Sequence, residues 1–195
     1  LPWTYSTDMR ISRDFKIFIF INLIFAGGNS SDVFLIIRTK DIFSGISNPV
    51  VMVLLAYVLY NLTYSLGSYP AGMLADRIGS KKVYTFGLLL FGLVYLGFAL
   101  NHHPAMVWVL FAVYGFYTAF TDGVGKAYAS KLVPEELRAT GMGVYHMSAG
   151  LATFAASAAA GLLWQVFGFR AAFLYGAGAA LLAVFLFVFL VKGKK

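Results

Sequence analysis

The 195-residue sequence has no cysteine and little charge. The absence of cysteine excludes disulfide bonds and metal sites built from thiolates. Charged residues make up only 12% of the chain and hydrophobic residues 60%, whereas a soluble domain carries roughly 25% charged residues. The mean hydropathy of +0.78 points in the same direction. This composition predicts a membrane protein, with the lipid bilayer as its first partner.

Other classes of function are also excluded. The net charge of +7 could suggest nucleic acid. The basic residues, however, form short clusters between apolar runs and no basic face with interleaved aromatics, so no nucleic-acid partner is expected. No motif of a hydrolase, a metalloprotease or a P-loop protein is present, so we expect no enzyme and no cofactor. His102 and His103 are adjacent and project in different directions, so no metal site is predicted.

Six apolar runs are long enough to cross a bilayer as helices, which takes roughly 20 residues each. They cover residues 15–37, 49–72, 83–100, 105–130, 141–166 and 170–191. The runs are too long for membrane strands and do not alternate, and short connections with turn residues separate them. The sequence therefore predicts an all-α membrane protein with six transmembrane helices. We expect residues 1–14 to be the end of a cytoplasmic linker, 15–195 to be the membrane domain, and Phe185, Phe187 and Phe189 to face lipid.

Lysine and arginine predict the orientation of this domain. Eleven of them fall on one side of the predicted bundle, three on the other, and Lys126 inside the membrane. The larger group is Arg10, Arg13, Lys16, Arg77, Lys81, Lys82, Lys131, Arg138, Lys192, Lys194 and Lys195; the smaller is Arg38, Lys40 and Arg170. Basic residues concentrate on the cytoplasmic side of a membrane protein, so both termini are expected in the cytoplasm.

The sequence also contains a weak internal repeat. A shift of 89 residues places residues 71–87 on residues 160–176 and pairs Gly79 with Gly168, Lys81 with Arg170 and Gly87 with Gly176. At nearly the same shift Asp32 meets Asp122. An odd number of helices separates the copies, so the halves, about 15–100 and 105–191, are expected to have opposite orientations. Three helices followed by three inverted helices is a transporter architecture.

One short charged stretch, GMLADRIGSKK at Gly72 to Lys82, lies between the second and third apolar runs. It resembles the signature loop of the major facilitator superfamily, and PEELR at Pro134 to Arg138 extends the resemblance. The resemblance implies the C-terminal six-helix half of a bacterial twelve-helix transporter. It also implies that the stretch is a conformational latch between halves, formed by Gly72, Asp76, Arg77, Gly79, Lys81, Lys82 and Arg138. The alternative for this stretch is a simple anchor at the anionic cytoplasmic membrane surface.

Polar groups inside a bilayer are costly and therefore mark candidate sites. In the first helix Asn22 and Asn29 share a face, Asp32 lies close to it, and Gly27-Gly28 predicts a hinge or break. In the second helix Tyr57, Asn61 and Tyr64 form one polar face with Ser68. In the fourth helix Asp122 and Lys126 have the i, i+4 spacing of an ion pair. The predicted substrate-binding set is Asn22, Asn29, Asp32, Tyr57, Asn61, Tyr64, Tyr114, Thr118, Asp122 and Lys126.

Structural interpretations of these residues remain open: hydrogen bonds that hold helices together, an interface between halves, or a buried ion pair. Two functions are therefore kept. The first is a secondary active transporter, or half of one, that moves a small organic solute across the bacterial inner membrane by alternating access with proton coupling. Its partner would be a second six-helix half, either a missing N-terminal domain or a second copy. The alternative is a self-associating six-helix module without transport activity of its own.

Overall fold

The computed structural model describes residues 12–191. Most of the predicted linker, with Arg10, and the lysines after Val191 therefore lie outside the described residues. The described chain is helical, without strands, in the order α1 (Arg13–Gly28), α2 (Val33–Ile42), α3 (Pro49–Ile78), α4 (Ser80–Leu100), α5 (Pro104–Lys131), a 3-10 turn (Glu135–Leu137), α6 (Arg138–Phe167) and α7 (Phe169–Leu190). Because α1 and α2 together form one span, six helical segments are long and apolar enough to cross a membrane. The prediction of six transmembrane helices is confirmed.

The ends of several helices differ from the prediction. The first span continues to Ile42 and the second to Ile78, five or six residues beyond the expected ends. Apolar runs mark where a helix leaves the hydrocarbon, whereas the backbone continues its helix into the polar interface. Most of the signature motif, Gly72 to Lys82, is consequently helical and not a loop. Helix α3 ends at Ile78, α4 begins at Ser80, and Gly79 is the only residue between them.

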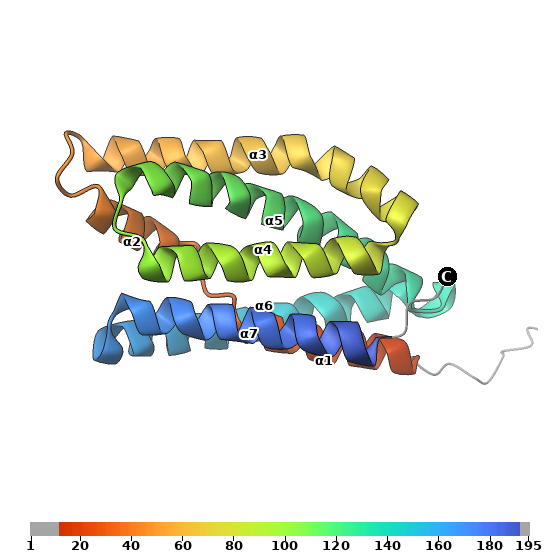
Figure 1. The fold of residues 1–195 in the computed structure, drawn as a ribbon. Coiled ribbons are helices and arrows are strands. Elements are labelled where there is room, and N and C mark those ends of the chain that lie inside the picture. The colour runs from red at the N-terminus through yellow and green to blue at the C-terminus, as the bar shows by residue number, and fades with distance from the viewer. Residues whose placement is uncertain (1–11, 192–195) are drawn as a thin grey trace, which may run out of the picture.

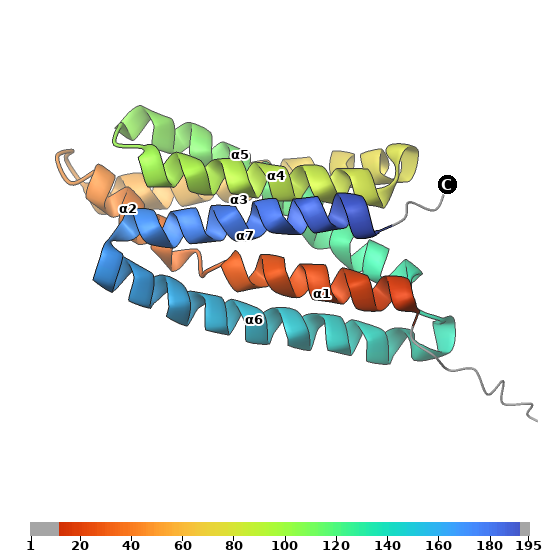
Figure 2. The same cartoon turned by 60° about the horizontal axis from the view of Figure 1, so that its bottom comes forward.

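The helices run up and down between two ends of the bundle (Figure 1). We call the end that holds Gly79 and the start of α1 the motif end; the turns at 43–48, 101–103 and Gly168 form the opposite end. Figure 1 shows α5 between α3 and α4, and Figure 2 shows α1 between α6 and α7. Helices α4 and α7 pack against each other and join the two groups. Exchanging the first span for the fourth, the second for the fifth and the third for the sixth leaves this set of partners unchanged.

The paired residues of the repeat occupy matching places. Gly79 and Gly168 each form a one-residue connection between helices with positive φ, 95° and 85°. Gly87 and Gly176 each lie where a third helix of a triple touches a first helix. A Cβ on Gly87 would lie 3.1 Å from the Cβ of Phe120 in α5, and one on Gly176 would lie 2.7 Å from the carbonyl oxygen of Gly28 in α1. The register of 89 residues read from the sequence therefore agrees with the packing, as expected for two inverted triples.

Aromatic rings fill the core near the motif end. The ring of Phe18 in α1 lies 5.1 to 5.9 Å from the rings of Tyr128, Tyr84, Phe187 and Tyr145. Phe187 is fully buried, so its predicted place facing lipid is wrong. The sequence does not separate the two environments because lipid and core are both apolar. Phe185 and Phe189, at 57% and 70% exposure, do lie on the outer surface of this chain.

Candidate functional site

The first span is broken near its middle. Helix α1 ends at Gly28, residues 29–32 are not helical, and α2 begins at Val33. A break exposes backbone groups that a continuous helix would pair, and inside a bilayer such groups must find partners within the protein. The weakness that the sequence predicts at Gly27-Gly28 is thus realised as a break of the helix.

All five other spans supply partners to this break. The Tyr175 hydroxyl of α7 donates to the carbonyl oxygen of Gly27 at 2.9 Å, and the backbone N–H of Ser31 donates to Ser157 Oγ of α6 at 3.1 Å. The remaining contacts come from tyrosine hydroxyls. They are Tyr95 of α4 at Ser30, Tyr117 of α5 at Asn29, and Tyr57 of α3 and Tyr114 of α5 at Asp32. The break is therefore a polar centre of the bundle, with hydrogen-bond partners in each of the other five spans.

Asp32 stands directly before α2, where the positive end of a helix dipole favours its charge. Its carboxylate accepts hydrogen bonds from the hydroxyls of Tyr114, at 2.7 Å, and Tyr57, at 3.4 Å. Within residues 12–191 no basic side chain forms an ion pair with it. This carboxylate is held by neutral donors alone, so a change in its charge breaks no salt bridge.

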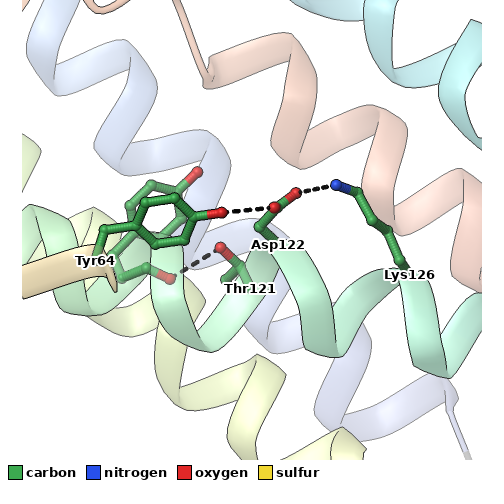
Figure 3. A network of polar contacts seen from close by, with 5 residues as sticks. Tyr64, Thr121, Asp122 and Lys126 are labelled. Atoms are coloured by element: carbon green, nitrogen blue, oxygen red, sulfur yellow. Dashed lines mark hydrogen bonds and ion pairs between the residues drawn. The ribbon is translucent and has the colours of Figure 1, made fainter. Parts of the chain in front are cut away.

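Asp122 forms the second polar centre, on α5. Lys126 Nζ lies 2.6 Å from one carboxylate oxygen, and the Tyr64 hydroxyl of α3 donates to the other at 2.9 Å. Figure 3 shows the two side chains reaching the carboxylate from opposite sides. The side chains of Lys126 and Asp122 are 44% and 39% exposed. Within this chain the pair is therefore not the buried structural pair that the sequence left open.

A cavity of about 350 Å³ lies between the two polar centres, and we call it the central cavity. It is lined by residues that belong to α1, α3, α4, α5 and α6 or directly follow α1, among them five of the predicted substrate-binding residues. These are Asn22, Asn29, Tyr64, Thr118 and Asp122. Asn22 is only 5% exposed; its Oδ1 accepts from the Tyr84 hydroxyl at 3.0 Å, and its Nδ2 has no hydrogen-bond partner.

The other five predicted residues lie around this cavity without lining it. Tyr57, Tyr114 and Asp32 form their own cluster at the break, and Lys126 is attached to Asp122. Asn61 is exposed and donates to the carbonyl oxygen of Tyr57 one turn earlier. Sequence reasoning missed Tyr84, Tyr117 and Tyr145, which line the cavity. A tyrosine in an apolar run is the signal that was available, since its hydroxyl requires a polar partner.

Comparison with known proteins gives the family. The model of the Major Facilitator Superfamily matches residues 17–195. The chain belongs to this superfamily. The resemblance carried by the motif is therefore confirmed, and the six-helix fold is that of one half of a superfamily member.

Two relatives add detail. An uncharacterized MFS-type transporter of Methanocaldococcus jannaschii is 36% identical over 183 residues, which is 93% of this chain and 46% of that protein. Multidrug resistance protein 2 of Bacillus subtilis is 32% identical over 123 residues, which is 63% of this chain and 30% of that protein. The chain thus spans half or less of the length of each relative. It is a multi-pass membrane protein of the major facilitator superfamily.

At the motif end, a lysine of the signature motif contacts the end of α7 in the same six-helix half. Lys81 Nζ donates to the carbonyl oxygens of Val188, at 3.3 Å, and Val191 at the end of α7. There it neutralises unpaired carbonyls and the negative end of the helix dipole. Asp76 lies in the last turn of α3 and makes no side-chain cap on α4.

A second cavity, of about 310 Å³, connects the signature with the site. It runs between α3 and α5 from Asp76 and Gly72 to Tyr64 and Asp122, and it shares the last two residues with the central cavity. Gly72 has no neighbour within 4 Å of where its Cβ would stand, so its surface is open in this half. Arg77, Lys82 and Arg138 are exposed at this end, and their role as a latch stays a prediction.

The opposite end contains a cluster that the sequence did not predict. Arg38 is 6% exposed and donates to the carbonyl oxygen of Asn101 at 2.7 Å, while its guanidinium lies 3.6 Å from the centre of the Phe169 ring. His102 lies between Arg38 and Arg170, with ring nitrogens 3.3 Å and 3.1 Å from them. These contacts fasten α2 to the turn at 101–103 and to α7, and so hold the segment beyond the break.

Proposed function

We propose that this chain forms one six-helix half of a secondary active transporter, which moves a small organic solute by alternating access with protons as the coupling ion. The proposal places it in a bacterial inner membrane with the motif end in the cytoplasm. The basic residues described at that end support this orientation. They are Arg13, Lys16, Arg77, Lys81, Lys82, Lys131 and Arg138. The name of the Bacillus subtilis relative, a multidrug resistance protein, supports an amphipathic solute.

One observation carries the proposal: a partly exposed ion pair lies deep within a membrane helix and beside a cavity. Asp122 is about 14 Å from the end of α5 at Lys131, at about 1.5 Å of rise per residue. Charges that face lipid at such depth cost several kcal/mol. The face that carries Asp122 and Lys126 must therefore adjoin water or protein, as the wall of a solute pathway between two halves does.

A second half also accounts for the exposure of α6. In the most apolar stretch of α6 only 11% of residues are buried, against 56% in α4. Its sequence from Ser148 to Gly161 is rich in alanine, glycine and serine, the small residues that allow membrane helices to pack closely. The relatives are at least twice as long as the matched region. The partner is a further domain of the same gene product or a second copy of the chain.

Asp32 is the proposed proton carrier. Its carboxylate is held by two tyrosine hydroxyls and by the start of α2, without a basic partner among the described residues. Taking up a proton therefore alters hydrogen bonds to α3 and α5 and leaves every ion pair intact. These bonds join the break in the first span to α3 and α5. Protonation of Asp32 would therefore change the conformation of the break.

The test uses the whole gene product in proteoliposomes that contain a pH-sensitive dye. A panel of amines, amino acids and sugars is added to one side and proton movement is followed. We expect at least one solute to move protons, Asp32→Asn to abolish that movement, and the double variant Asp122→Asn/Lys126→Gln to lose uptake. Because the pair is half-exposed, the double variant should lose less than about 1 kcal/mol of stability. Lys40→Gln, an exposed lysine that lines neither cavity, is the matched control and should keep activity.

Two results would count against the proposal. A double variant with full uptake would make the Asp122–Lys126 pair a structural brace. A gene product that moves no solute of the panel and purifies as a tight oligomer would favour the self-associating module.

A further inference from the structure

The central cavity has the chemistry of a site for a positive organic group. Among the described residues that line it, Asp122 is the only charged one; Lys126 pairs with that carboxylate from outside the lining. Six of the other thirteen lining residues are aromatic, namely Phe25, Tyr60, Tyr64, Tyr84, Tyr117 and Tyr145. The faces of such rings are electron-rich and attract cations. A carboxylate surrounded by aromatic rings is complementary to an ammonium or another delocalised cation.

An unpaired donor adds a second requirement. Asn22 is nearly fully buried and lines the cavity, its oxygen is occupied by Tyr84, and its Nδ2 group lacks a partner. A buried donor without an acceptor is destabilising, roughly by 1–3 kcal/mol. A solute with a carbonyl or ether oxygen would satisfy it. The donor and the carboxylate thus define two points of contact in one cavity.

Lys126 occupies the place that such a cation would take. Its ammonium lies 2.6 Å from Asp122, yet its side chain is 44% exposed, so the pair is weak and the flexible stem is free to swing away. The carboxylate stays fixed when Lys126 leaves, because Tyr64 holds its other oxygen at 2.9 Å. A cationic solute could therefore replace Lys126 at the Asp122 carboxylate.

We propose that the central cavity binds an organic cation with a hydrogen-bond acceptor, and that Lys126 is a tethered competitor which neutralises Asp122 when no solute is bound. The inference rests on the proposed function and deepens it by naming the class of solute. It differs from an anion site, in which Lys126 itself would bind the solute. The two cases give Lys126 effects of opposite sign.

The test measures equilibrium binding of two probes of matched size and opposite charge, tetraphenylphosphonium and tetraphenylborate, to the whole gene product in detergent. We expect the phosphonium to bind more tightly than the borate. Lys126→Gln should tighten phosphonium binding by about two- to fivefold, the factor that corresponds to the worth of an exposed pair. Asp122→Asn should weaken it at least about tenfold. Lys40→Gln removes an exposed lysine that lines neither of the two cavities and should change nothing.

The opposite pattern overturns the inference: tighter binding of the borate, or weaker phosphonium binding by Lys126→Gln. The comparison of probes on the unaltered protein decides the sign of charge even where a variant does not fold. Transport and binding also fail separately. The expected binding without solute movement would refute the proposed function alone, whereas proton-linked uptake of neutral solutes without cation preference would refute this inference alone.

Discussion

A single methyl group added at Gly79 tests how the signature is folded. Gly79 has φ 95° and ψ 136°, and nothing lies within 4 Å of the position that a Cβ would take. The Gly79→Ala variant therefore meets no steric neighbour, and its whole cost is backbone strain. For a residue with a side chain in such a conformation that cost is about 1–3 kcal/mol. We expect the free energy of unfolding to fall by this amount.

The same substitution seven residues earlier is the matched control. Gly72 also has nothing within 4 Å of a Cβ, but it lies inside α3 with helical backbone. Alanine in place of glycine stabilises a helix interior by about 0.5–1 kcal/mol. Two identical chemical changes in one motif should thus have opposite signs and differ by about 1.5–4 kcal/mol, the sum of both effects. Gly168→Ala, at the matching turn of the repeat, should behave like Gly79→Ala.

The assay is unfolding in mixed micelles of increasing dodecyl sulfate content, followed by tryptophan fluorescence. Equal unfolding midpoints for the two variants would refute the reasoning, as would a more stable Gly79→Ala protein. If Gly72→Ala is stable but slows transport, the open surface at Gly72 is the place where another part of the transporter approaches.

Three further predictions concern two sets of contacts and the orientation in the membrane. Tyr114→Phe should cost about 1.5–3 kcal/mol, the worth of a hydrogen bond to a charged group, and Tyr57→Phe clearly less, because their distances to the carboxylate are 2.7 and 3.4 Å; equal losses in the micelle assay would contradict this ranking. Lys81→Met should lower stability by about 0.3–1 kcal/mol, since it uncaps the end of α7, and an unchanged midpoint at low salt would argue against the cap. For orientation, an impermeant maleimide added outside intact cells should label a cysteine placed at His103 and spare one at Lys82, both exposed positions in a chain without cysteine; the reverse labelling would invert the topology.

Those features that depend on local composition were predictable from the sequence. Each span is an apolar run of sufficient length, and the break follows from two adjacent glycines before a polar segment at Gly27 to Asp32. The repeat was readable because Gly79 and Gly168 must both be glycine for the same reason, a positive φ. The i, i+4 spacing of Asp122 and Lys126 likewise determines their pairing.

Features that depend on how helices rotate against one another were not predictable. The bond from Tyr175 to Gly27 joins residues 148 apart in sequence, and the cap by Lys81 joins residues 110 apart. Neither has a local pattern. Arg38 was assigned to a polar end region, yet it is buried, because the first span extends to Ile42 and brings the guanidinium over Phe169.

The broken first span has a consequence for biosynthesis. The backbone groups and polar side chains at the break find partners in the other five described spans, and the carbonyl of Gly27 is bound by Tyr175 of the sixth. Its neighbours α6 and α7 are synthesised after the other four described spans. A nascent chain with only the first triple inserted therefore holds unpaired polar groups in lipid, which cost several kcal/mol each. The first span is therefore expected to stay at the translocon or to remain an unbroken helix until the sixth span arrives, so the break forms only after the second triple has been inserted.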